Sequence, residues 1–158
     1  MHYELYMSAA LAEARAAASS GERPRGAVAV LGEAMVAGGH EQALGSGDPT
    51  AHAVIVTLRE AARRLGARSL AGVTVFSAVE PCAMCVGALL ACDADGLVFA
   101  LPDPLEGAAG SALQLAQHGA LKRRLNVVSG ILEADARELV DGSRSLPGRA
   151  VGARQGSG

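Results

Sequence analysis

The chain is poor in aromatic side chains, in cysteine and in long apolar runs. It has no tryptophan, two phenylalanines and two tyrosines, so it offers few flat side chains on which an unpaired base could stack. Its apolar runs stay well short of the roughly 20 residues that span a bilayer. The first residues, 1–4, lack the basic and apolar segments of a signal peptide. We therefore expect a cytoplasmic protein.

An excess of charge of either sign is also missing. Lysine and arginine number 14 and the acidic residues 16, so the formal net charge of −2 creates no overall positive field that would attract nucleic acid. The length of 158 residues, half of them apolar, fits one domain with a proper core. We expect this domain to cover residues 1–140 and a flexible tail, rich in glycine, serine and arginine, to follow over residues 141–158.

Helical and strand-like patterns alternate along the chain. Together they predict an α/β layered sandwich with a mixed sheet. The predicted strands cover residues 26–31, 35–38, 72–79, 96–100 and 126–129, the first two forming a hairpin; the predicted helices cover residues 3–19, 51–65, 113–120 and 131–140, with one more beginning at Pro81. We expect Asp48 or Thr50 to cap the helix over residues 51–65, which places His52 in its first turn.

Two of the three cysteines, Cys82 and Cys85, form a C-x-x-C pair at the start of a predicted helix. An odd cysteine count does not make a disulfide framework, so the pair indicates either a metal site or a redox centre. The proline before the pair and His52, at the start of another helix, favour zinc. One histidine and two cysteines would leave the fourth tetrahedral position open for water, as in catalytic zinc sites. We expect one Zn²⁺ per chain, with Cys92 as a small core residue.

Three segments resemble the zinc-dependent cytidine and tRNA-adenosine deaminase family, and within it the bacterial tRNA adenosine deaminases. They are residues 48–53 (DPTAHA), 80–88 (EPCAMCVGA) and 103–111 (DPLEGAAGS), and the resemblance extends over residues 3–140. It implies a cytidine-deaminase-like three-layer α/β/α sandwich with a mixed five-stranded sheet, and a homodimer. It also implies hydrolytic deamination of adenine or cytosine in a nucleoside or tRNA, with a glutamate in H-x-E that moves protons without binding zinc.

The sequence departs from this pattern at Val54, which occupies the position of that glutamate. An isopropyl group neither accepts nor donates a proton, so we expect weak or absent catalysis. The noncatalytic subunit of the eukaryotic heterodimeric tRNA adenosine deaminase shows the same change, which suggests a pseudoenzyme or a partner subunit in a heterodimer with a catalytic deaminase. Gly-x-Asn, the basic substrate loop and Phe-Phe-Arg of the family are replaced by residues 38–40 (GGH), 105–106 (LE) and 142–144 (GSR), which argues against tRNA binding.

The alternative is an active nucleoside or tRNA adenosine deaminase with a substitute acid/base group. The candidates near the metal ligands are His40, Glu41, Asp48 and Asp103, although Asp48 also suits a helix cap and Asp103 a loop hydrogen bond. A small nucleobase or nucleoside would contact residues near the metal. The residues expected to line its binding site are His40, Ala53, Glu80 and Asp103.

Overall fold

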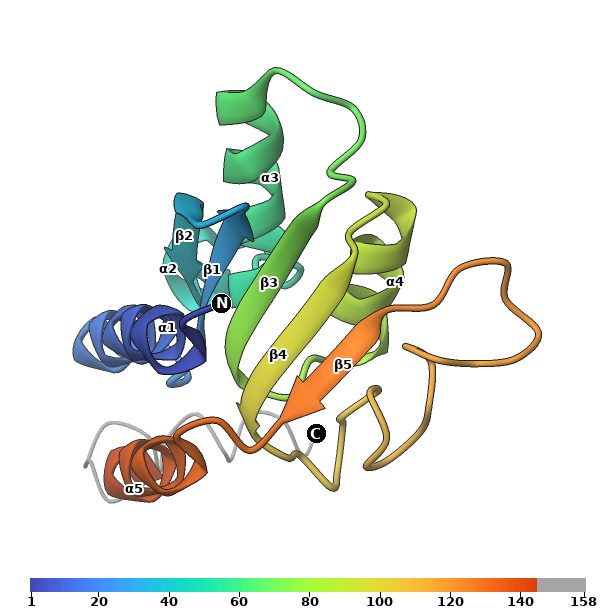
Figure 1. The fold of residues 1–158 in the computed structure, drawn as a ribbon. Helices are drawn as coiled ribbons and strands as arrows, with labels where there is room; N and C mark the ends of the chain where they lie inside the picture. The colour runs from blue at the N-terminus through green and yellow to red at the C-terminus, as the bar shows by residue number, and fades with distance from the viewer. Residues whose placement is uncertain (145–158) are drawn as a thin grey trace.

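The computed structural model of the chain describes residues 1–144, which are built around a single five-stranded sheet (Figure 1). Helices cover both faces of this sheet. In chain order the elements are α1 (Tyr3–Ser19), β1 (Gly26–Leu31), β2 (Ala34–His40), α2 (Ala43–Ser46), α3 (Ala53–Leu65), β3 (Val73–Val79), α4 (Ala83–Ala91), β4 (Gly96–Leu101), β5 (Asn126–Ser129) and α5 (Glu133–Arg144).

The sheet is mixed, with strand order β2-β1-β3-β4-β5. β1 is antiparallel to both β2 and β3, whereas β3, β4 and β5 run parallel to one another. Parallel neighbours need a crossover connection, and α4 provides it between β3 and β4. The predicted three-layer α/β/α sandwich with a mixed five-stranded sheet is confirmed (Figure 1).

Each face of the sheet has its own apolar core. α3 and α4 pack on one face, where Leu58 and Leu89 join Val75 of the central strand. α1 and α5 pack on the other face, where Met7 lies in one cluster with Phe76. Because side chains alternate along a strand, β3 contributes to both cores and ties the three layers together.

The starts of two helices differ from the sequence prediction. α3 begins at Ala53, so His52 is its N-cap residue and not part of its first turn. α4 begins at Ala83, so Cys82 is the N-cap and Pro81 precedes the helix. The prediction that Asp48 or Thr50 caps α3 is wrong, because both lie before the N-cap and Asp48 instead accepts hydrogen bonds from the backbone and hydroxyl of Thr50.

Other differences lie where long-range contacts override local propensity. The predicted helix over residues 113–120 is wrong: this segment forms turns, and Leu115 and Ala116 donate backbone hydrogen bonds to Ala108 instead of to their own helical turn. The short helix α2 was not predicted. α5 begins at Glu133 and continues to Arg144, so it includes the first residues of the predicted tail; residues 145–158 lie outside the described residues.

Within residues 1–144, every helix falls short of the length or the apolar character that a membrane crossing requires.

We predict that Gly26→Ala lowers the free energy of unfolding by about 1 to 3 kcal/mol, the usual cost of overpacking. A Cβ at Gly26 would lie 2.7 Å from the carbonyl carbon of Glu13 and closer still to the backbone of Ala10 and Ala14, so α1 would have to move away from β1. The matched control is Gly87→Ala in α4, where a Cβ meets no described atom within 4 Å and helix propensity improves. Urea unfolding measures both; equal stability of the two variants would contradict the close packing of α1.

Candidate metal centre

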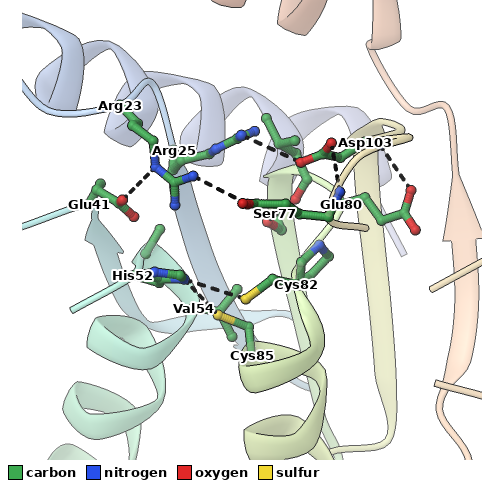
Figure 2. A pocket seen from close by; sticks show the side chains of 14 residues that line it. Arg23, Arg25, Glu41, His52, Val54, Ser77, Glu80, Cys82, Cys85 and Asp103 are labelled. Carbon is green, nitrogen blue, oxygen red and sulfur yellow. Dashed lines mark hydrogen bonds and ion pairs between the residues drawn. The ribbon is translucent and has the colours of Figure 1, made fainter. Parts of the chain in front are cut away.

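Three side chains that suit a metal ion converge where α3 and α4 begin. His52 and Cys82 are the N-cap residues of the two helices, and Cys85 follows in the first turn of α4. Their ligand atoms all lie within 4.8 Å of one another, and Figure 2 shows the three side chains pointing to a common point. We call His52, Cys82 and Cys85 the donor cluster.

The geometry of the donor cluster fits tetrahedral zinc. Zn–S bonds of about 2.3 Å and Zn–N bonds of about 2.0 Å at a tetrahedral angle place nitrogen and sulfur about 3.5 Å apart. In the structure, Nδ1 of His52 lies 3.5 Å from Sγ of Cys82 and 3.6 Å from Sγ of Cys85. Three protein donors leave one tetrahedral position free, so the predicted zinc shell is consistent with the structure.

The surroundings of the donor cluster favour a thiolate. Both N-cap residues have extended backbone conformations and make no side-chain cap hydrogen bond within the described residues, so the positive ends of α3 and α4 face the donors. A hydrogen bond from Cys85 lowers the pKa of Cys82 to about 5, with His52 contributing. The same pairing raises the pKa of Cys85, because its proton is held between the two sulfurs.

Val54 lies beside the donor cluster in the first turn of α3. Its side chain is 3% exposed and lines the same pocket as the three donors. The position therefore presents only hydrocarbon to the space over the metal.

The outer part of this pocket is charged. Its lining includes a charged rim, which we define as Arg23, Arg25, Glu41, Asp103 and Glu106. The hydrogen bond from Arg23 to Glu41 is 2.8 Å long, and longer ion pairs join Arg23 to Glu106 (3.5 Å) and Arg25 to Asp103 (3.6 Å). With these side chains in place, about 30 Å³ remains for the centres of water-sized molecules.

The pKa values of the two arginines of the charged rim shift in opposite directions. Burial opposes the charge of Arg23, but its hydrogen bond and ion pair with Glu41, together with Glu106, raise its pKa overall. Burial and the neighbouring charge of Arg23 lower the pKa of Arg25, against the weaker opposing effect of Asp103. Arg23 is therefore the more firmly paired of the two.

Glu80 binds the loop that carries two residues of the charged rim, Asp103 and Glu106. Its buried carboxylate accepts hydrogen bonds from the backbone N–H groups of Asp103 (3.1 Å), Ala109 (2.9 Å) and Ser111 (3.1 Å), and from the Ser111 hydroxyl. A Cβ at Gly107 would meet this carboxylate, so the loop passes close to Glu80 only because residue 107 is glycine. Glu80 thus lines the pocket with both oxygens already engaged.

The structure brings some of the predicted site residues to the donor cluster and places others elsewhere. Ala53, Glu80 and Asp103 line the pocket. His40 lies outside it, with Nδ1 2.9 Å from Oε2 of Glu13, and Asp48 lies outside it beside Thr50 and Arg59. Asp103 accepts hydrogen bonds from the backbone of two residues in its own loop, the role that its sequence suggests.

The third cysteine and three residues of the charged rim complete the comparison with the sequence predictions. Cys92, the C-cap residue of α4, packs against the apolar core, as predicted. Arg23, Arg25 and Glu106 were not identified from the sequence as site residues. The one available signal was the R-P-R run over residues 23–25, which places two charges directly before a fully apolar strand.

The comparisons with known proteins agree with this geometry. Residues 1–101 match the family described as "Cytidine and deoxycytidylate deaminase zinc-binding region". The chain is 36% identical over 132 residues to the tRNA-specific adenosine deaminase of Bacillus subtilis, covering 84% of this chain and 82% of that protein. It is 33% identical to the tRNA-specific adenosine deaminase of Agrobacterium fabrum, covering 85% and 89%.

The fold comparison gives the same result. A solved structure from work on A-to-I editing by tRNA:A34 deaminases at the wobble position of transfer RNA superposes with a TM-score of 0.82 at 33% identity. The superposition covers 85% of this chain and 97% of that chain.

We predict that the purified chain holds one zinc ion and that His52→Ala or Cys82→Ser abolishes this content, because two donors do not complete the shell. Cys92→Ser is the matched control and should keep the metal. Atomic absorption after gel filtration measures the stoichiometry. Zinc loss from Cys92→Ser as complete as from Cys82→Ser would contradict the assignment.

We also predict that Glu80→Gln lowers the free energy of unfolding by about 1 to 3 kcal/mol, because an amide nitrogen cannot accept the hydrogen bonds that the carboxylate accepts. Glu106→Gln is the control, since Glu106 is exposed and its ion pair is long. Urea unfolding of both variants tests this; an unchanged Glu80→Gln variant would show that the loop does not depend on the carboxylate.

Proposed function

The chain belongs to the cytidine and deoxycytidylate deaminase family of zinc-binding proteins, and from this we propose that it is a member whose own deamination chemistry is weak or absent. The observation that carries the proposal is Val54, which stands beside an intact donor cluster at the position where the family signature H-x-E has its proton-carrying glutamate. The site would thus bind zinc but lack the proton-carrying group that catalysis requires.

The chemistry explains why one residue has this effect. When bound, zinc supplies Lewis acidity and an activated water. Hydrolytic deamination further needs a group that takes a proton from water and returns protons to the ring nitrogen and the leaving amine. The side chain of Val54 can do neither, and general acid–base catalysis is worth about 10² to 10⁴ in rate.

The positions of three of the four alternative acid/base candidates support the proposal, whereas the fourth, Glu41, lines the pocket and is paired there with Arg23. Both His40 and Asp48 lie outside the pocket. His40 is paired with Glu13, and the carboxylate of Asp48 accepts a hydrogen bond from Thr50. Asp103 lines the pocket, but its carboxylate already accepts two backbone hydrogen bonds and faces Arg25.

The proposal includes a role that does not need turnover. The chain would act as a partner subunit, in a homodimer or in a heterodimer with a catalytic deaminase, or as a binding module for a small nucleobase or nucleoside. A net charge of −2 gives it no general attraction for RNA, so tRNA is not part of the proposal.

We predict that Val54→Glu raises deaminase activity by about 10² to 10⁴ over the unmodified chain, because the proton carrier is restored beside the metal. The assay follows ammonia release from adenosine, cytidine, guanine and a tRNA anticodon stem-loop with zinc-loaded protein. Val54→Gln has a similar size, carries no transferable proton, and should stay at the level of the unmodified chain. Robust turnover of any of these substrates by the unmodified chain would end the proposal.

A further inference from the structure

Glu41 is a buried carboxylate whose hydrogen-bonding capacity is half used. The residue is 3% exposed and lines the pocket over the donor cluster. Its Oε2 accepts a hydrogen bond of 2.8 Å from Nε of Arg23, whereas Oε1 is buried without a hydrogen-bond partner among the described residues. An unsatisfied buried oxygen costs free energy, so the site is built to be completed by a further donor.

The backbone fixes Glu41 in this place. Its N–H donates to the carbonyl of Arg25 at 3.1 Å, and the N–H of the next residue, Gln42, donates to the carbonyl of Ala51 at 3.0 Å. Ala51 directly precedes His52, so Glu41 is tied both to the start of β1 and to the segment that carries a metal donor. Figure 2 shows Glu41 and Arg23 facing each other across the pocket from the donor cluster.

Arg23 is the more exposed member of the pair. Its side chain is 40% exposed, against 4% for Glu41, and its second contact is a 3.5 Å ion pair to Glu106, which is itself 60% exposed. The outer contact of Arg23 is therefore weak, and a ligand that replaces Arg23 on Glu41 has mainly the 2.8 Å hydrogen bond to displace. With Arg23 in place, the space of about 30 Å³ suits one or two water molecules and not a nucleobase.

We infer that Arg23 lies on Glu41 at the place where a ligand with an amidine edge binds. An amidine edge is a pair of N–H groups on two nitrogens that are bonded to the same carbon. A guanidinium has this edge, but Arg23 uses only one N–H on Glu41. A ligand that presents both would satisfy Oε1 and Oε2 together, as bidentate donors do. Guanine and amidinium ions carry such an edge. This inference rests on the proposal that the pocket binds a small nucleobase-like ligand.

The charge of the rim agrees with this choice of ligand. Three carboxylates, those of Glu41, Asp103 and Glu106, face two guanidiniums. The excess of negative charge favours a neutral or cationic donor over an anion. Arg23 then acts as a positioning residue for Glu41 and as the competitor that a ligand displaces.

The test compares guanosine with inosine, which differ only in the 2-amino group that completes the amidine edge. Calorimetric titration of the zinc-loaded full chain should show guanosine binding about tenfold more tightly than inosine, the usual worth of a charge-assisted hydrogen bond. Glu41→Gln should remove this preference, because the amide offers one acceptor and one donor. Arg23→Gln should strengthen guanosine binding several-fold, because the competitor is weakened.

Arg64→Gln is the matched control, since Arg64 forms an exposed ion pair with Glu60 outside the pocket; it should bind both nucleosides as the unmodified chain does. Equal affinity for guanosine and inosine, or no binding of either, overturns the inference. So does an Arg23→Gln variant that binds guanosine no better than the unmodified chain. Zinc content and the activity of Val54→Glu report separately on the proposed function, so the two can fail independently.

Discussion

The packing of α3 and α4 side by side on one face of the sheet is the constraint on which the site depends. Both helices begin at the same end of the sheet, so their N-cap residues, His52 and Cys82, come within bonding reach of one ion although 30 positions separate them in the chain. The N-termini of both helices then face the thiolate charge of the cluster. The metal donors are therefore held where two core helices begin, and their positions depend on the packing of these helices.

The pocket over the donors has a second level of organisation that depends on buried carboxylates. Glu80 binds the backbone of the loop after β4 and fixes Asp103 and Glu106 at the pocket entrance. Glu41 binds Arg23 and is itself held by the backbone of Arg25, the residue before β1. Both carboxylates are almost fully buried, yet their hydrogen bonding differs. Both oxygens of Glu80 accept hydrogen bonds from the chain, while Oε1 of Glu41 has no hydrogen-bond partner among the described residues. A structural carboxylate and a binding carboxylate are distinguished by their unused hydrogen-bonding capacity.

Val54 is compatible with the fold for a physical reason. Val54 belongs to the apolar core that joins α3 to the sheet, where a valine side chain packs well. The metal donors and the rest of the pocket walls depend on residues other than Val54.

The sequence by itself determined the metal donors, the mixed sheet and the valine at position 54, because each follows from a local pattern. These patterns are a histidine and a C-x-x-C pair at helix starts, alternating strands and helices, and a valine two residues after the histidine. Only the tertiary structure decided which side chains line the outer part of the pocket and how they are paired. The pairing of Arg23 with Glu41 joins residues 18 positions apart, and the role of Glu80 depends on backbone groups up to 31 positions away, which no local pattern records. The same long-range bonds converted the helix expected over residues 113–120 into turns, because backbone pairing with Ala108 outweighs intrinsic helix propensity.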